Sequence, residues 1–81
     1  MTNRHHQRAE ALFASTLQAG ESPDQEAVVR ETTTLLADAG PVGCSAAMAY
    51  EFGEHPELAV RRMRWARQTV QRCFEEKQEQ R

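Results

Sequence analysis

The chain has 81 residues, of which 40% are hydrophobic and 27% charged, and its formal net charge is −2 at pH 7. This length and composition exclude wholesale disorder and predict a single small domain over 1–81, with frayed ends at 1–4 and 76–81. No apolar run is long enough to cross a membrane, and the opening MTNRHHQRAE lacks the apolar segment of a signal peptide. We therefore expect a cytoplasmic protein without a membrane partner.

The first two helices follow from the spacing of apolar residues and from the turn residues beside them. One is expected over 3–18, with Gly20 as its stop signal. The next is expected over 22–39. Its predicted N-cap is Ser22, and Gln25 three positions later completes a capping box.

The third helix is predicted over 45–53. Gly40 and Pro41 are expected to stop the helix before it, and 42–45 to form a short loop. The small residues at 46–49 are expected to lie deep, because small side chains let helices approach closely. A glycine at position 53 is expected to end this helix.

The fourth helix, expected over 56–75, is the longest. At about 100° per residue its apolar side chains fall in one narrow sector, a seam that packs on another helix. The seam consists of Ala59, Met63, Ala66, Val70 and Cys73, with Phe74 at its edge. The four helices predict an all-α fold, a compact bundle with a long C-terminal helix. Its predicted core contains Leu12, Phe13, Leu17, Val28, Leu35, Leu36, Ala49, Phe52, Met63, Ala66 and Val70.

Acidic and basic residues are segregated along the chain. The stretch 19–57 holds eight acidic residues against Arg30 alone, whereas 58–74 holds five arginines and no acid. Arginines at this density suit phosphate or carboxylate groups, so they indicate a recognition face. The alternative is that they pair with the acidic stretch, within the chain or between subunits. The candidate contact residues are Arg61, Arg62, Arg64, Trp65, Arg67 and Arg72.

Two further observations bear on chemistry. Trp65 lies off the apolar seam, where it either closes the rim of the core or serves as an exposed anchor. The histidines and cysteines show no metal-binding spacing, and no nucleophile stands beside a base. We therefore expect no enzyme, metal site, cofactor or small-molecule substrate. Cys44 and Cys73 are expected as thiols, and whether they lie close together stays open.

The third and fourth helices partly match a helix-turn-helix. Ala49 and Gly53 have the spacing of its small residue and turn glycine. Val60 and Met63, the contacts expected from the second helix, arrive one residue late, and Glu54 stands where an apolar residue is usual. The alternative is an ordinary pair of packed helices.

The segment AVRRMRWARQTV within the fourth helix resembles the recognition helix of the bacterial sigma-factor region that reads promoter DNA. This resemblance covers some twenty residues. It implies a major-groove face of Glu57, Arg61, Arg62 and Arg64, with Arg67 or Arg72 on the phosphates.

A wider resemblance rests on the run GCSAAMAYEFGEHPELAVRRMRWA. It is similar to a pattern, GCAA…EFGxHPExAxxRMxWA, of small uncharacterised actinobacterial helical proteins. The opening RHHQRAEALFASTLQ and the tripeptide ESP are similar to theirs as well, so the resemblance covers most of the chain. It implies a stand-alone helical protein and adds no catalytic residue or ligand.

Two classes of function are compatible with these observations. The first is a non-catalytic regulatory or protein-interaction module, expected as a homodimer, that presents Trp65 and its neighbouring arginines to an acidic protein partner or to a second copy. The alternative is a small DNA-binding transcriptional regulator that uses the third and fourth helices as a helix-turn-helix-like pair.

Overall fold

The computed structural model describes residues 3–78, with the side chains of 4–74. Its elements in order are α1 (Asn3–Ala14), a short 3₁₀ helix η1 (Ala19–Glu21), α2 (Gln25–Asp38), α3 (Gly40–Glu54) and α4 (Pro56–Gln78). No strand occurs among these residues. The predicted all-α fold with a long C-terminal helix is confirmed.

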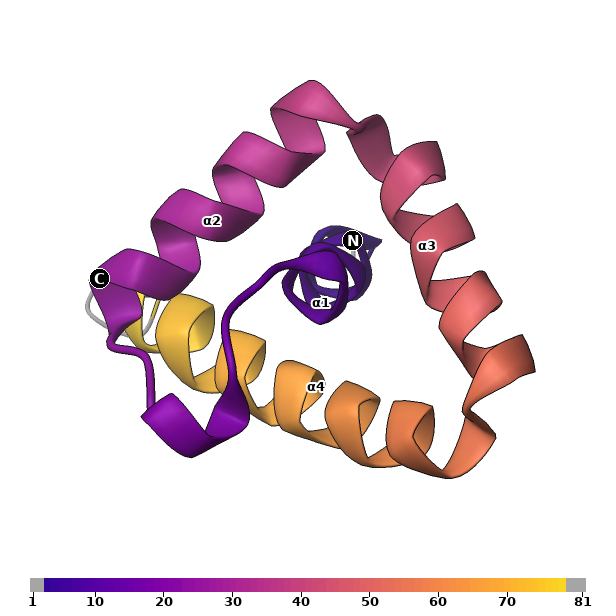
Figure 1. Cartoon of the computed structure of the whole chain (residues 1–81). Coiled ribbons are helices and arrows are strands. Elements are labelled where there is room, and N and C mark those ends of the chain that lie inside the picture. Colours follow the sequence, from indigo (N-terminus) through magenta and orange to yellow (C-terminus); the bar gives the residue numbers. More distant parts are fainter. Residues whose placement is uncertain (1–2, 79–81) are drawn as a thin grey trace.

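The first helix lies inside the other three. In Figure 1, α1 is seen end-on at the centre of a triangle formed by α2, α3 and α4. Residues 9–13 of α1 are all buried, so this stretch has no solvent-facing side. Ala9 and Ala11 keep it narrow enough for the surrounding helices to approach closely. Glu10, the polar residue in the stretch, pairs through Oε2 with Nε2 of His6 at 3.1 Å.

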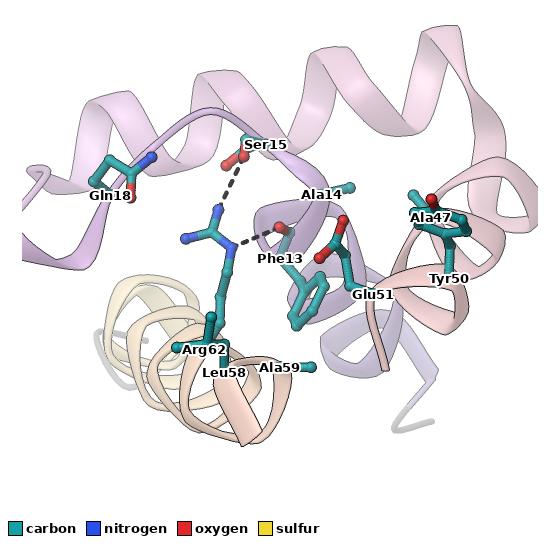
Figure 2. Close-up of a pocket in the computed structure, with 10 residues that line it drawn as sticks. All are labelled: Phe13, Ala14, Ser15, Gln18, Ala47, Tyr50, Glu51, Leu58, Ala59 and Arg62. Carbon is teal, nitrogen blue, oxygen red and sulfur yellow. Dashed lines mark hydrogen bonds between the residues drawn. The ribbon is translucent and has the colours of Figure 1, made fainter. Parts of the chain in front are cut away.

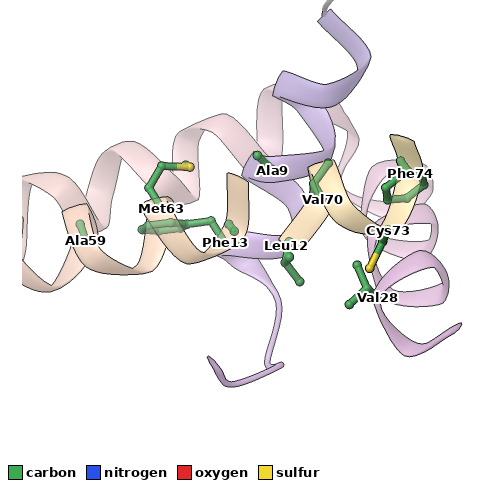
Figure 3. Packing of buried hydrophobic residues seen from close by; sticks show 10 residues of the cluster. Ala9, Leu12, Phe13, Val28, Ala59, Met63, Val70, Cys73 and Phe74 are labelled. Carbon is green, nitrogen blue, oxygen red and sulfur yellow. The ribbon is translucent and has the colours of Figure 1, made fainter. Parts of the chain in front are cut away.

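The core forms where α4 packs on α1. Figure 3 shows side chains of the α4 seam beside Leu12 and Phe13 of α1 and Val28 of α2. Every predicted seam residue is buried, because the seam keeps one face of α4 against α1 over four turns. Six predicted core residues are buried, namely Leu12, Phe13, Val28, Met63, Ala66 and Val70. Leu17 and Phe52 are partly buried against this cluster, and Leu35 and Leu36 are half-buried.

The prediction that the small residues of α3 lie deep is wrong. Ala46, Ala47 and Ala49 are exposed. The inward face of α3 is formed instead by the series Cys44, Met48 and Phe52, in which each residue follows the last by one helical turn.

The predicted start of the second helix is also wrong. Ser22 has φ +49° and ends η1 by donating its N–H to the carbonyl oxygen of Ala19. The N-cap of α2 is Asp24, whose Oδ1 accepts the N–H of Ala27 at 2.9 Å. Gln25 does not complete a capping box, because its Nε2 donates to the carbonyl oxygen of Cys73 in α4 at 2.7 Å.

The predicted loop at 42–45 is helical. A single left-handed residue, Gly40 at φ +77°, turns the chain between α2 and α3. Pro41 then occupies the first turn of α3, where its missing N–H costs nothing. The same Gly-Pro pair thus ends one helix and begins the next. The glycine at position 53 lies within α3, which continues to Glu54.

The ends of the outer helices differ from the prediction as well. α1 ends at Ala14, because the Ser15 hydroxyl bonds the backbone on both sides: Oγ donates to the Leu12 carbonyl at 2.7 Å and accepts the Leu17 N–H at 3.2 Å. Of the segments expected to fray, 3–4 belong to α1 and 76–78 to α4. The remainder, 1–2 and 79–81, lies outside the described residues.

Candidate functional site

Four arginines lie on the outer sides of α4. Arg61, Arg64, Arg67 and Arg72 are all exposed. Among the side chains of 4–74, none of them forms an ion pair, because both ion pairs found there join a histidine to a glutamate of the same helix. Pairing of the basic helix with the acidic stretch of its own chain is therefore not found in that part. We call Val60, Arg61, Arg64 and Arg67 the α4 basic surface.

An apolar hollow of about 380 Å³ interrupts the α4 basic surface where α3 ends against α4. It is lined by Phe52, Val60, Met63, Arg64, Arg67 and Gln68. We call it the α3–α4 hollow. Val60 is 46% exposed and also lines a second, adjoining depression that contains Arg61 and Glu57. Apolar side chains flanked by arginines that form no ion pair within the described part of the chain fit a partner that carries an apolar side chain beside carboxylates.

The fifth arginine, Arg62, turns inward. Its Nε donates to the carbonyl oxygen of Phe13 at 2.8 Å, and its Nη2 donates to those of Ser15 and Leu17, both at 2.9 Å. The end of α1 leaves such carbonyls without helical partners, and a cation there also complements the helix dipole. Burial lowers the pKa of Arg62, and the nearby Glu51 carboxylate partly offsets this. The Arg62 side chain is therefore engaged in closing α1.

Trp65 lies beside Arg62 at the edge of the core. It is partly buried and packs against the hydrophobic cluster. The guanidinium carbon of Arg62 lies 5.0 Å from the centroid of the Trp65 ring and 5.8 Å from that of Phe13, within the range of cation–π attraction. Trp65 thus closes the rim of the core, the first of its two expected interpretations.

A separate groove of about 460 Å³ lies on the other side of α4, between the end of α1, α3 and the start of α4. Figure 2 shows the Arg62 side chain crossing one end of it to the carbonyls of Phe13 and Ser15. Tyr50 and Leu58 line the groove and are 64% and 60% exposed. Both are large apolar side chains that the fold leaves in contact with water.

Three nucleophilic side chains, those of Ser15, Cys44 and Cys73, are bonded to the backbone or buried. The Ser15 hydroxyl is bonded to the backbone, as described above. Cys44 and Cys73 are buried thiols, and neither forms a disulfide within the described residues. Burial, with a smaller contribution from the charge of Glu10, raises the pKa of Cys44 and so disfavours its reactive thiolate form. Within the described residues, no three His, Cys, Asp or Glu side chains are grouped to hold a metal ion.

Sequence reasoning did not assign three residues to these surfaces, and it gave Val60 only a contact between the two helices of the possible helix-turn-helix. Val60 breaks the pattern of α4, because it is an apolar residue on the polar side of a regular amphipathic helix. That irregularity is a signal for an exposed apolar contact. Phe52 was assigned only to the core, and Tyr50 received no role, since neither exposure nor a neighbouring helix end can be read from one helix alone.

No protein-family model, curated protein or solved structure matches this chain. The resemblances to a sigma-factor recognition helix and to actinobacterial proteins stay predictions. No helix within the described part of the chain is long and apolar enough to span a lipid bilayer.

Proposed function

We propose that the protein is a non-catalytic interaction module that binds an acidic protein surface through the α4 basic surface. The observation that carries the proposal is a group of exposed arginines that form no ion pair among the described side chains: Arg64 and Arg67 line the α3–α4 hollow, and Arg61 lines the adjoining depression. Arg61, Arg64 and Arg67 follow one another at intervals of three residues, so their like charges repel along the helix. Carboxylates on a partner relieve this repulsion, and an apolar side chain in the hollow adds buried area.

A protein partner suits this surface better than DNA does. In a helix-turn-helix, Ala49 and Val60 would form contacts between the two helices, but here both are exposed. Arg62, expected in the major groove, is engaged with the end of α1. A DNA phosphate backbone also has no apolar group that could fill the α3–α4 hollow. DNA binding is therefore the alternative, and the same experiment tests it.

The acidic partner is either a second copy of the chain or a different protein. A homo-oligomer is the form expected from so small a domain. A cytoplasmic location, in which both cysteines stay reduced, belongs to the same proposal.

The test is a fluorescence-anisotropy titration of the protein into two labelled probes, an acidic helical peptide with one leucine among glutamates and a mixed-sequence DNA duplex. We expect the peptide to bind and the DNA to bind more weakly, with both affinities falling as salt rises. The double variant Arg64→Glu/Arg67→Glu should bind the peptide at least about tenfold more weakly. Arg72→Glu is the matched control, because Arg72 is equally an exposed arginine of α4 but does not line the hollow.

The two alternatives give different results. Tight binding of the duplex without peptide binding supports the DNA-binding regulator. Peptide binding that survives the double variant contradicts the assignment of the α4 basic surface, because the contact then lies elsewhere on the molecule.

A further inference from the structure

We propose that the acidic surface bound by the α4 basic surface is α3 of a second copy, with Tyr50 inserted into the α3–α4 hollow. This inference rests on the proposed function and names its partner. Tyr50 is the anchor, and the carboxylates of Glu51 and Glu54 meet Arg64 and Arg67 at the rim of the hollow.

The outer side of α3 has the form of an acidic docking helix. Tyr50 is 64% exposed, the highest value for an aromatic side chain in the described part of the chain. Around it, alanines such as Ala46 and Ala47 are also exposed. Short side chains let a second helix surface come close, so the tyrosine ring stands above its surroundings. Tyrosine is among the residues that most often anchor protein interfaces.

The charges of the two helices are complementary. α3 contains Glu51 and Glu54 and no arginine or lysine, whereas the α4 basic surface contains arginines alone as its charged residues. Both pairs have the same spacing, because Glu51 and Glu54 are three residues apart, as are Arg64 and Arg67. At about 1.5 Å of rise per residue, each pair spans about 4.5 Å along its helix. Two carboxylates can therefore meet two guanidinium groups across one contact.

The position of the glutamates also favours an external cation. Glu51 and Glu54 lie in the last turn of α3, where a negative charge opposes the helix dipole. No basic residue occupies that turn. His55, just beyond the helix, pairs with Glu51 at 3.3 Å but is charged only when protonated. Arg62 of the same chain lies near Glu51, but its guanidinium is bonded to carbonyls at the end of α1. Arginines of a second copy supply a permanent positive charge that is not engaged in this way.

Tyr50 and the α3–α4 hollow lie on opposite sides of α4, so Tyr50 cannot enter the hollow of its own copy. Tyr50 lines the groove beside Leu58, whereas the hollow is lined by Val60. Two residues apart on a helix means about 200° of rotation, which is nearly opposite. Each contact therefore leaves one free anchor and one free hollow, and pairing is head-to-tail. A symmetric contact of α4 with α4 would place arginines against arginines and is disfavoured.

The test uses two variants that each remove one half of the contact. Sedimentation equilibrium of the wild-type protein should give an average mass that rises with concentration beyond that of a dimer. Tyr50→Ala and Arg64→Glu/Arg67→Glu should each be monomeric when alone. Their equimolar mixture should give a dimer and nothing larger, because only one intact anchor and one intact hollow remain. Arg72→Glu should associate like the wild type.

Circular dichroism checks that each variant keeps its helical content, and Val60→Asp replaces the charge variant if that one unfolds. A wild-type protein that stays monomeric, a closed dimer that does not grow, or a mixture that stays monomeric overturns the inference. The proposed function is judged separately by the acidic peptide. If the peptide binds the wild type and not the charge variant, the surface stands and its partner is another protein.

Discussion

Both sides of α4 carry arginines, but the arginines on the two sides have different roles. Arg62 lies on one side, with its guanidinium bonded to carbonyls at the end of α1. Arg64, two residues on and nearly opposite, is exposed and forms no ion pair among the described side chains. Arg62 is thus structural because backbone carbonyls near the end of α1 lie within reach of its guanidinium, whereas no such bond is found for Arg64 among the described residues. The residue alone does not decide this.

Replacing Arg62 should produce the largest effect. Arg62→Ala leaves several carbonyls of the α1 end without a donor, and a hydrogen bond to a charged group contributes about 1.5–3 kcal/mol. We expect the free energy of unfolding to fall by about 3 kcal/mol, measured by urea denaturation. Arg62→Lys should recover only part, because lysine lacks the planar fork. Arg64→Ala is the control, and a loss as large there would erase the contrast between the two sides.

Reversing the charges on the other side should affect binding and leave the fold intact. For Arg64→Glu/Arg67→Glu we expect about a tenfold or greater loss of affinity for the acidic helical peptide, since each exposed pair contributes about 0.2–1 kcal/mol and reversal adds repulsion. The urea midpoint should stay close to that of the wild type. A shift in that midpoint comparable to the one for Arg62→Ala would show that these arginines also hold the fold.

The start of α2 also has two similar residues of which only one has a structural role, and we expect a smaller effect there. Asp24 caps the helix, whereas Ser22, two residues earlier, does not. Asp24→Ala should lower the free energy of unfolding by about 1 kcal/mol, the usual cost of losing an N-cap. Ser22→Ala should change it by less than about 0.5 kcal/mol. Thermal or urea unfolding of both variants measures this, and equal losses would contradict the assigned cap.

The smallest effect concerns Cys44 and pH. Its pKa is raised in the folded protein, so the unfolded chain loses this proton first. Above about pH 8.5, where an ordinary thiol ionises, Cys44 therefore makes the folded state less stable as the pH rises, until the pH passes its folded-state pKa. Urea unfolding at about pH 7.5 and 9.5 should show a smaller decrease for Cys44→Ala than for the wild type. Equal decreases would mean that the thiol ionises alike in both states.

The features that could be predicted from the sequence are those that depend on the periodic spacing of apolar residues along a single helix. The seam of α4 was found because five apolar residues share one sector, and each is buried. The all-α fold follows from such periodicity. Helix ends were predicted less well, because Ser22 and Asp24 are both good N-caps. The choice between them depends on α4, whose Cys73 carbonyl accepts the side chain of Gln25.

The candidate site was predicted in outline only. Counting arginines located the α4 basic surface, but Arg62 was grouped with its neighbours, since its carbonyl partners lie 45 or more positions away in the chain. Ala49 was placed in the core because small apolar residues suit close packing. The structure instead gives the inward face of α3 to Cys44, Met48 and Phe52.

The enclosed position of α1 has a consequence for how the chain acquires its structure. α1 is synthesised before α4, but α4 supplies much of its cover and the guanidinium that bonds the carbonyls near its end. Leu12 and Phe13 therefore lack part of their cover until α4 has left the ribosome. In a fragment that ends before α4, the side of α1 that α4 covers stays exposed to water.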